Sequence, residues 1–333
     1  MEKKLLLSVK KLSISFNSNN VLSKAVNSIS FDVYENEIVG VIGESGSGKS
    51  VTALLLMRLI QFSEKTKFSG TVTYKGMDIK ELSEKEIQSV RGREIAMVFQ
   101  EPMSALNPSM TCGSQVREIL LHHDVVNKKD LNDEVLRLFN SVKIPDAHMA
   151  VQKYPHELSG GQQQRVMIAM AIACKPKILI ADEPTTALDV TVQKEIIALL
   201  SSLQKETKMS IIFISHDLAL VSEISNRILV MYKGRIIENG DTNTVLKTPK
   251  EPYTKALISA KPKTGKRLKR LPTIKDILSG SNKLEIITKK EREKRHKKIY
   301  NSPPILRVET LKRYTLKDTV CFLEKHHLKL LTM

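Results

Sequence analysis

The chain has 333 residues, 41% of them hydrophobic, which is enough to bury a sizeable core in one large domain or in two. The net charge is +17, but residues 261–333 alone hold 21 basic and 7 acidic side chains, a net +14. The remaining +3 leaves residues 1–260 without the charge excess of a nucleic-acid-binding face, so nucleic acid is not an expected partner. The apolar runs are no longer than a strand, which excludes a membrane-spanning helix, and the N-terminus lacks a signal-peptide pattern.

Up to about residue 260, strand-like and helical segments alternate. Strands are predicted over 5–16, 28–34, 37–42, 71–74, 95–99, 178–181, 210–215, 228–232 and 235–239. Helices are predicted over 51–60, 162–174, 190–206 and 218–225, and a mostly helical stretch, broken by two prolines, over 113–158. Strands that alternate with helices predict an α/β fold with a parallel sheet. The long helical stretch is expected to be an inserted subdomain.

A glycine-rich loop connects the predicted strand 37–42 to the predicted helix 51–60. It fits the phosphate-binding P-loop pattern G-x-x-x-x-G-K-[ST]. Its glycines let backbone N–H groups turn inward around phosphate oxygens, and the helix adds the positive end of its dipole. Lys49 is expected to reach the β- and γ-phosphates of a nucleotide, and Ser50 to bind Mg²⁺. The candidate nucleotide-binding residues here are Gly43, Ser45, Gly46, Ser47, Gly48, Lys49, Ser50 and Val51.

Two carboxylates follow the apolar run 178–181, which is typical of a strand buried on both faces. Ligands of such sheets bind outside the carboxyl ends of the strands, where Asp182 and Glu183 would lie. Asp182 is the candidate Mg²⁺ ligand, through water. Glu183 is the candidate general base for an attacking water, a role typically worth about 10²- to 10⁴-fold in rate.

A second glycine-serine segment opens the predicted helix 162–174. Ser159 can cap this helix, and the two glycines that follow let a phosphate approach backbone N–H groups at the helix start. Further candidate nucleotide-binding residues are therefore Ser159, Gly160, Gly161 and Gln162.

With these motifs in this order, residues 5–260 resemble the ATP-binding cassette (ABC) ATPases. The resemblance implies an α/β fold, namely an ABC-type P-loop NTPase core with an antiparallel β subdomain and an inserted helical subdomain. It makes Gln100 the Q-loop glutamine that senses Mg²⁺ and γ-phosphate, and His216 the switch histidine that orients the attacking water. Asp189 matches the D-loop, and Phe16 is the candidate aromatic residue for stacking on adenine.

The same resemblance implies ATP and Mg²⁺ as ligands and a second ABC ATPase, identical or different, as a partner. Two cassettes would pack head to tail, so that the Ser159–Gln162 segment of one faces the ATP held by Lys49 of the other. The ATP joins two positive helix ends, and hydrolysis releases them. The helical subdomain would contact transmembrane permease subunits.

Two further segments narrow the resemblance. Residues 98–108 resemble the Q-loop extension of oligopeptide/dipeptide importer ATPases, and residues 251–257 resemble the segment that follows the cassette in them. This implies an ATPase that energises peptide import, peripheral at the cytoplasmic face of the cell membrane, with an extracytoplasmic substrate-binding protein as an indirect partner. Nickel or glutathione import, a soluble non-transport ABC ATPase and a truncated, inactive cassette stay open as alternatives. Many relatives carry a cysteine-rich stretch after this segment, whereas here only Cys321 follows, so no iron–sulfur cluster is expected.

Three parts of the chain are therefore expected: an ABC ATPase domain (1–260), a basic linker (261–305) and a short tail (306–333). A charge block like the linker is usually a solvated segment, and an anionic membrane surface or a partner is the alternative interpretation. Residues 306–311 repeat the apolar spacing of residues 7–12, so the tail resembles the truncated start of a second cassette. A shifted reading frame in the tail is one hypothesis for this, and a native short tail is the other.

Overall fold

The computed structural model describes residues 4–18, 21–60, 66–186, 188–260, 267–270, 273–279 and 285–304. The chain divides into two compact units, Met1–Ser259 and Ala260–Met333. The expected start of a second cassette, residues 306–333, lies outside the described residues. The division into cassette, linker and tail stays a prediction.

A six-stranded sheet, in the order β10-β9-β3-β8-β7-β6, forms the centre of the first unit. Its strands are β3 (Ile38–Ile42), β6 (Ile95–Val98), β7 (Ile178–Asp182), β8 (Ser210–Ser215), β9 (Arg227–Tyr232) and β10 (Arg235–Asp241). The strands from β9 to β6 are parallel, and only β10 pairs antiparallel. The four strands from β3 to β6 are buried at every position, which explains why their sequences are apolar runs and not alternating patterns.

A four-stranded antiparallel sheet, in the order β2-β1-β4-β5, lies beside it. Its strands are β1 (Leu5–Ser18), β2 (Val21–Tyr34), β4 (Thr66–Tyr74) and β5 (Met77–Asp78). Strand β1 closely matches the predicted range 5–16, whereas β2 begins well before the predicted range 28–34, because it pairs with β1 from Val21 onward, interrupted by register shifts. The expected antiparallel β subdomain beside a P-loop core is confirmed.

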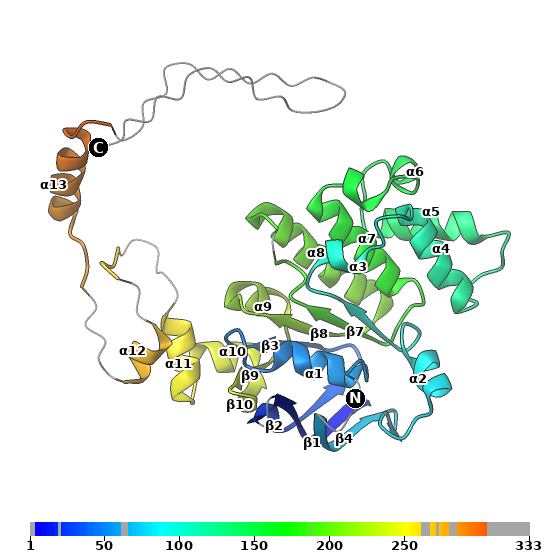
Figure 1. Ribbon diagram of the computed structural model, residues 1–333. Coiled ribbons are helices and arrows are strands. Elements are labelled where there is room, and N and C mark those ends of the chain that lie inside the picture. The colour runs from blue at the N-terminus through cyan, green and yellow to red at the C-terminus, as the bar shows by residue number, and fades with distance from the viewer. Residues whose placement is uncertain are drawn as a thin grey trace. The chain divides into compact units, whose positions relative to one another are not determined.

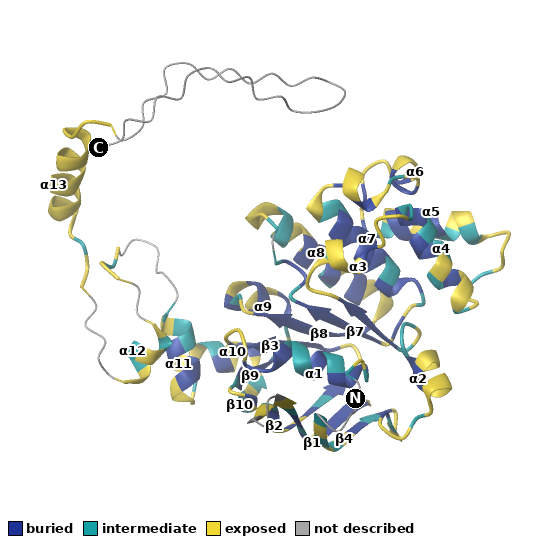
Figure 2. Cartoon of the chain, viewed as in Figure 1, coloured by how far each residue is buried: buried dark blue, intermediate teal, exposed yellow. Residues whose placement is uncertain are grey.

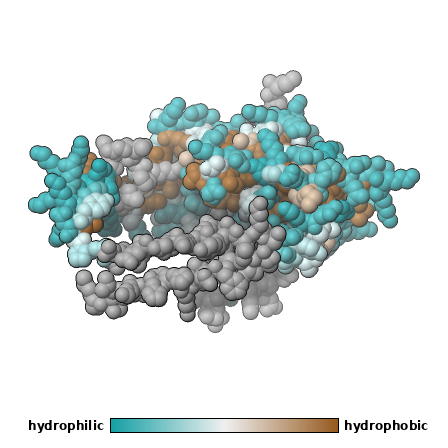
Figure 3. Space-filling view, turned by 90° about the horizontal axis from the view of Figure 1, so that it is seen from above, coloured by the Kyte–Doolittle hydropathy of each residue, from teal (hydrophilic) through white to brown (hydrophobic). Residues whose placement is uncertain are grey.

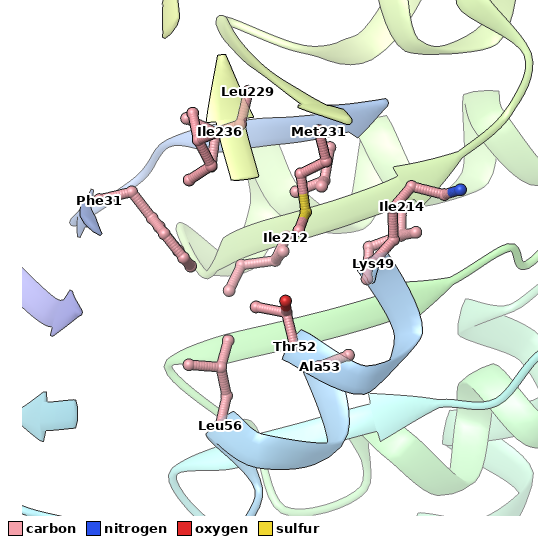
Figure 4. Close-up of a pocket in the computed structure, with 11 residues that line it drawn as sticks. Phe31, Lys49, Thr52, Ala53, Leu56, Ile212, Ile214, Leu229, Met231 and Ile236 are labelled. Carbon is pink, nitrogen blue, oxygen red and sulfur yellow. The ribbon is translucent and has the colours of Figure 1, made fainter. Parts of the chain in front are cut away.

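Helix α1 (Lys49–Leu56) lies between the two sheets and shares one hydrophobic core with both (Figure 1). Figure 4 shows its apolar face: Ala53 and Leu56 face Ile212 and Leu229 of the large sheet across a cavity of ≈ 10 Å³. A cavity of this size is about one water molecule across, and here it is lined mainly by apolar groups. The amine of Lys49 points away from it. Core packing thus fixes α1 and, with it, the loop at its N-terminus.

The helices between β6 and β7 form a group of their own (Figure 1). They are α3 (Pro102–Ala105), α4 (Cys112–His122), α5 (Leu131–Ser141), α6 (Ala147–Ala150), the 3₁₀ helix η1 (Pro155–Glu157) and α7 (Gly160–Ile172). Helix α7 packs against α3, α4 and α5 and also against β6, so it connects this group to the large sheet. The expected inserted helical subdomain is confirmed.

The remaining helices of the first unit are α2 (Glu84–Val90), α8 (Val190–Thr207), α9 (Leu218–Ile224), α10 (Thr242–Lys247) and α11 (Pro252–Ser259). Helix α9 packs on β3 and β8, and α8 packs on α7 and α9. The sequence pattern does not predict α2, α3, α10 or α11. Each has eight residues or fewer, which is too short to display a 3.6-residue apolar period.

The second unit contains α12 (Ile274–Leu278) and α13 (Lys289–Tyr300). Every residue of α13 is exposed, as Figure 2 shows. The basic segment lacks the apolar period that predicts a helix, but a capping box of Thr288 and Glu291 satisfies the first backbone N–H groups of α13. Among the described helices, none combines the length and the apolar character needed to cross a bilayer.

Candidate functional site

Loops from four neighbouring parallel strands meet at one edge of the large sheet. In the order of the strands, these are the P-loop (43–50) after β3, His216 after β8, Asp182 and Glu183 at the end of β7, and Gln100 beyond β6. Ligands of parallel sheets bind outside these strand ends. The strand order, and not proximity in sequence, therefore brings the predicted catalytic residues to the P-loop.

A surface cleft of ≈ 500 Å³ lies at this edge, a size typical of small-molecule sites. Its lining residues are Ser45, Gly46, Gly48, Lys49, Ser50, Val51, Gln100, Glu183, Thr186 and His216. With the exception of Thr186, all of them are candidates named from the sequence.

The P-loop owes its shape to the structure behind it. Gly48 is the N-cap of α1 and has a φ of 100°, a left-handed conformation that favours glycine. A Cβ atom at Gly48 would lie 2.6 Å from the carbonyl oxygen of Ala25, and one at Gly43 would lie 2.2 Å from that of Met231. Backbone of β2 and β9 thus packs directly against the loop, and glycine is required at both positions.

Lys49 lies at the base of the cleft and is only 5% exposed. Its Nζ donates hydrogen bonds to the carbonyl oxygens of Gly43 (2.9 Å) and Glu44 (3.0 Å). Burial lowers the pKa of Lys49, and the carboxylates of Glu183 and Asp182 act in the opposite direction. The amine is therefore held at the cleft, within the electrostatic influence of both carboxylates.

Ser50 and Asp182 come together although 132 residues separate them in the chain. The Ser50 Oγ donates a hydrogen bond to Asp182 Oδ1 at 3.0 Å, and Asp182 is 4% exposed. Burial raises the pKa of Asp182, and the hydrogen bond from Ser50 opposes that shift. The hydroxyl and the carboxylate together offer the hard oxygen ligands that Mg²⁺ prefers.

Glu183 is the centre of a hydrogen-bond cluster. Its Oε2 lies 3.0 Å from His216 Nδ1, accepts a hydrogen bond from Thr186 Oγ1 at 2.9 Å, and lies 3.5 Å from Gln100 Nε2. The backbone of Glu183 has a φ of 45°, and its N–H donates to the carbonyl of Ile214 at 2.9 Å. A left-handed non-glycine residue is uncommon and is often found at functional sites.

Thr186 is a site residue that the sequence reasoning misses. The turn after β7 returns Thr186 to Glu183, since the Thr186 N–H donates to the Glu183 carbonyl at 3.1 Å. A threonine three residues after a carboxylate is the available sequence signal, because short hydroxyl side chains often bond within a turn.

The second glycine-serine segment does not line the cleft. Ser159 caps α7 as predicted, and it forms a capping box with Gln162 (3.4 and 3.0 Å). Ser159 and Gly160 are exposed, whereas Gly161 and Gln162 are partly buried. A Cβ at Gly161 would lie 2.7 Å from the side chain of Val192 on α8, so glycine at this position allows the two helices to pack closely within this chain.

The other candidates also lie outside the lining of the cleft. Asp189 caps α8, accepting hydrogen bonds from the backbone N–H groups of Thr191 (3.0 Å) and Val192 (2.9 Å). Phe16 is partly buried against the hydrophobic core, and its proposed contact with adenine stays a prediction. Ser47 of the P-loop is 4% exposed. Ala187, which precedes Asp189 by two residues, is outside the described residues.

Comparisons with known proteins identify the family of this chain. Residues 26–186 match the ABC transporter family, and residues 237–286 match the C-terminal region of oligopeptide/dipeptide transporters. The dipeptide transport ATP-binding protein DppD of Escherichia coli is 46% identical over 275 residues, covering 83% of this chain and 84% of that protein. The oligopeptide transport ATP-binding protein OppD of Bacillus subtilis is 45% identical over 257 residues, covering 77% and 72%.

Solved structures show the same fold. The dimeric ATP-binding cassette MJ0796, in a post-hydrolysis state bound to ADP and Pi, has a TM-score of 0.64 at 26% identity and covers 71% of this chain and 99% of its own. The cassette cbiO1 of Clostridium perfringens has a TM-score of 0.63 at 28% identity and covers 74% and 92%. These findings confirm the resemblance seen in the motifs, and the chain belongs to the ABC transporter ATPases, as an ATP-binding protein of the oligopeptide/dipeptide transporter family.

Proposed function

We propose that this chain hydrolyses ATP to energise peptide import, as one of two cassettes under a pair of permease subunits. The observation that carries this proposal is an asymmetry. The P-loop, Gln100 and the general base Glu183 line one cleft, and Asp182 is hydrogen-bonded to Ser50 beside it. The glycine-serine segment at Ser159 does not line this cleft, and Ser159 and Gly160 are exposed. The names of the relatives, dipeptide and oligopeptide transport ATP-binding proteins, support peptides as the cargo.

The residues of the cleft divide the chemistry among them. The P-loop backbone and Lys49 would bind the phosphates and stabilise charge that develops in the transition state. Glu183 Oε2 would accept the proton of the attacking water. His216 Nδ1 and Thr186 Oγ1, at 3.0 and 2.9 Å, hold that carboxylate in one orientation. An oriented carboxylate favours this role, because a general base must lie within hydrogen-bond reach of the proton that it takes.

Three oxygen-bearing side chains suit Mg²⁺. Ser50 and Asp182 already lie 3.0 Å apart, and Gln100 lies across the same cleft beside Glu183. Hydroxyl, carboxylate and amide oxygens form a hard donor set, which fits this ion. We propose that these three residues hold it. When bound, Mg²⁺ neutralises charge on the phosphate oxygens.

The exposed segment at Ser159 supports a second cassette. A Cβ at Gly160 would meet only Leu188 Cδ2, at 3.5 Å, which is an ordinary contact. Nothing in the described part of this chain therefore requires glycine at position 160. Since neither the backbone conformation nor the packing of this chain requires glycine here, its lack of a side chain suits the close approach of another group. The phosphates of a nucleotide on another cassette are such a group. The dimeric solved cassette is consistent with this arrangement.

The helical group offers a surface for permease subunits. Its exposed hydrophobic side chains are Met103 (77%), Met149 (62%), Leu121 (41%) and Tyr154 (40%). Figure 3, seen from above, shows hydrophobic areas among the hydrophilic ones on the molecule. Exposed apolar side chains mark a protein contact where they form one continuous patch, and we propose that these four side chains contribute to such a patch. Docking there would place the chain at the cytoplasmic face of the membrane, with a substrate-binding protein as an indirect partner on the other side.

Replacement of the base tests this function. Glu183→Gln keeps the size of the side chain but cannot accept a proton, so ATP binding should persist while turnover falls by about 10²-fold or more. The measurement is phosphate release by the chain assembled with its permease subunits and partner cassette, together with ATP-dependent association of the cassettes by size-exclusion chromatography. Rapid turnover by Glu183→Gln would contradict the assignment of the base.

Lys49→Ala is the matching variant that tests nucleotide binding and not hydrolysis. It removes the buried amine that faces the phosphates, and we expect most nucleotide affinity to be lost. Calorimetric titration with ADP and Mg²⁺ measures this directly. Unchanged affinity would remove the P-loop from the proposed site.

A further inference from the structure

Helix α11, the last helix of the first unit, reaches back to the P-loop. Tyr253, at the start of α11, is 4% exposed, and its hydroxyl oxygen accepts a hydrogen bond from the backbone N–H of Glu44 at 3.1 Å. The two residues are 209 positions apart in the chain. Tyr253 belongs to the segment 251–257, which the chemistry described above does not use.

The ring of Tyr253 makes a second connection. It stacks on Tyr232, the last residue of β9, with ring centroids 4.1 Å apart and the ring planes at 31°. The turn after β9 also holds the loop, because the N–H of Gly234 donates to the Ser47 carbonyl at 3.0 Å. Tyr253, Tyr232 and Gly234 thus form a connected group of contacts that supports the P-loop from behind.

Tyr253 is itself held in place. Glu238 of β10 accepts hydrogen bonds from the backbone N–H groups of Lys250 (2.8 Å) and Glu251 (3.2 Å), directly before α11. Ala256, on the same helix, is fully buried. The carboxylate satisfies N–H groups at the start of the helix, and the buried face anchors it to the cassette. The hydroxyl of Tyr253 therefore approaches Glu44 from a fixed support.

The peptide units around Glu44 are held from two sides. Tyr253 binds the Glu44 N–H, and Lys49 Nζ binds the Glu44 carbonyl at 3.0 Å. Phosphate would compete for the amine of Lys49, but not for Tyr253, because Glu44 is not among the residues that line the cleft. Burial raises the pKa of Tyr253, so its hydroxyl stays neutral at physiological pH. The contact with Tyr253 can thus preserve the loop conformation when Lys49 turns to the nucleotide.

We propose that Tyr253 is a positioning residue for nucleotide binding, which connects the C-terminal helix of the cassette to the P-loop. This inference rests on the proposed nucleotide site. It gives the segment 251–257 a role within the ATPase itself: the segment keeps the first turn of the P-loop in the shape that binds phosphate.

The test compares two chemically identical changes in the full-length chain. Tyr253→Phe removes the hydroxyl and keeps the stacked ring, whereas Tyr300→Phe removes the hydroxyl of a side chain that is 80% exposed on α13. ADP with Mg²⁺ is the probe, since ADP needs the same loop and is not turned over. We expect the dissociation constant of Tyr253→Phe to rise about three- to tenfold, as for loss of one neutral hydrogen bond, and that of Tyr300→Phe to stay unchanged.

Two further measurements separate positioning from general stability. Hydrogen exchange of the Glu44 amide should accelerate in Tyr253→Phe, and in the assembled transporter KM for ATP should rise while kcat is kept. A lowered melting temperature with an unchanged dissociation constant would overturn the proposal and leave Tyr253 a merely structural residue. If Lys49→Ala also binds ADP normally, the proposed nucleotide site fails as well. If Tyr253→Phe binds ADP normally but Lys49→Ala does not, the nucleotide site stands and only the inference about Tyr253 fails.

Discussion

The P-loop and the segment at Ser159 have similar composition but opposite surroundings. Both combine glycine and serine at the start of a helix, at α1 and α7. In the P-loop, Ser47 and Lys49 are 4% and 5% exposed, and β2 and β9 pack against the loop. At α7, Ser159 and Gly160 are exposed, and a simple capping box completes the helix start.

The difference indicates two separate reasons for glycine at the start of a helix in this protein. Gly48 is required by its own chain, because its φ is 100° and the Ala25 carbonyl leaves no space for a side chain. Gly160 has ordinary helical surroundings and space for a methyl group. The fold therefore explains the first glycine, whereas the second is explained only by the proposed approach of a nucleotide on another cassette. Substitutions at these glycines can separate the two causes.

The largest effect is expected for Gly48→Ala. The new Cβ would combine a left-handed φ with a contact of 2.6 Å to backbone, which does not move easily. We expect a loss of more than about 2 kcal/mol in the free energy of unfolding, with loss of nucleotide binding. Urea denaturation measures the first. Gly46→Ala is the control: its φ is 78°, but no atom lies within 4 Å of the added Cβ, so only the conformational part of about 1 kcal/mol should appear.

Gly160→Ala should separate stability from activity. Alanine is the better helix former, so the free chain should be as stable or more stable by about 0.4–1 kcal/mol. ATP turnover of the assembled transporter should nevertheless fall about tenfold or more, since the methyl group would obstruct the approach of the opposite nucleotide. Normal turnover by this variant would show that no group approaches Gly160 closely, and the head-to-tail arrangement would lose its support.

The smallest effect is expected for Gly161→Ala, which should lower the free energy of unfolding through a contact within the chain. The added Cβ would lie 2.7 Å from Val192 Cγ1, so the side chain of Val192 must shift. Overpacking of this kind costs about 1 kcal/mol or somewhat more. A second substitution, Val192→Ala, should restore part of the loss, and a double-mutant cycle in urea measures the coupling. Strictly additive effects would contradict the packing explanation.

Sequence patterns were most informative where structure is local. The P-loop, the capping box at Ser159 and the fully buried strand β7 all depend on residues a few positions apart. Their backbone hydrogen bonds and caps close within one turn or one strand, so the pattern carries the information. Short helices such as α11 cannot be predicted in this way, because one or two turns show no apolar period. Such helices form through tertiary packing.

The sequence alone determined the family, the phosphate loop, the base Glu183 as a candidate and the order of the strands and helices that carry them. Only the tertiary structure placed His216 on Oε2 of Glu183, packed Phe16 against the hydrophobic core, and brought Tyr253 to Glu44. Contacts of this second kind join segments far apart in the chain. They arise from the strand order and from side-chain packing, which no pattern within a short window can specify.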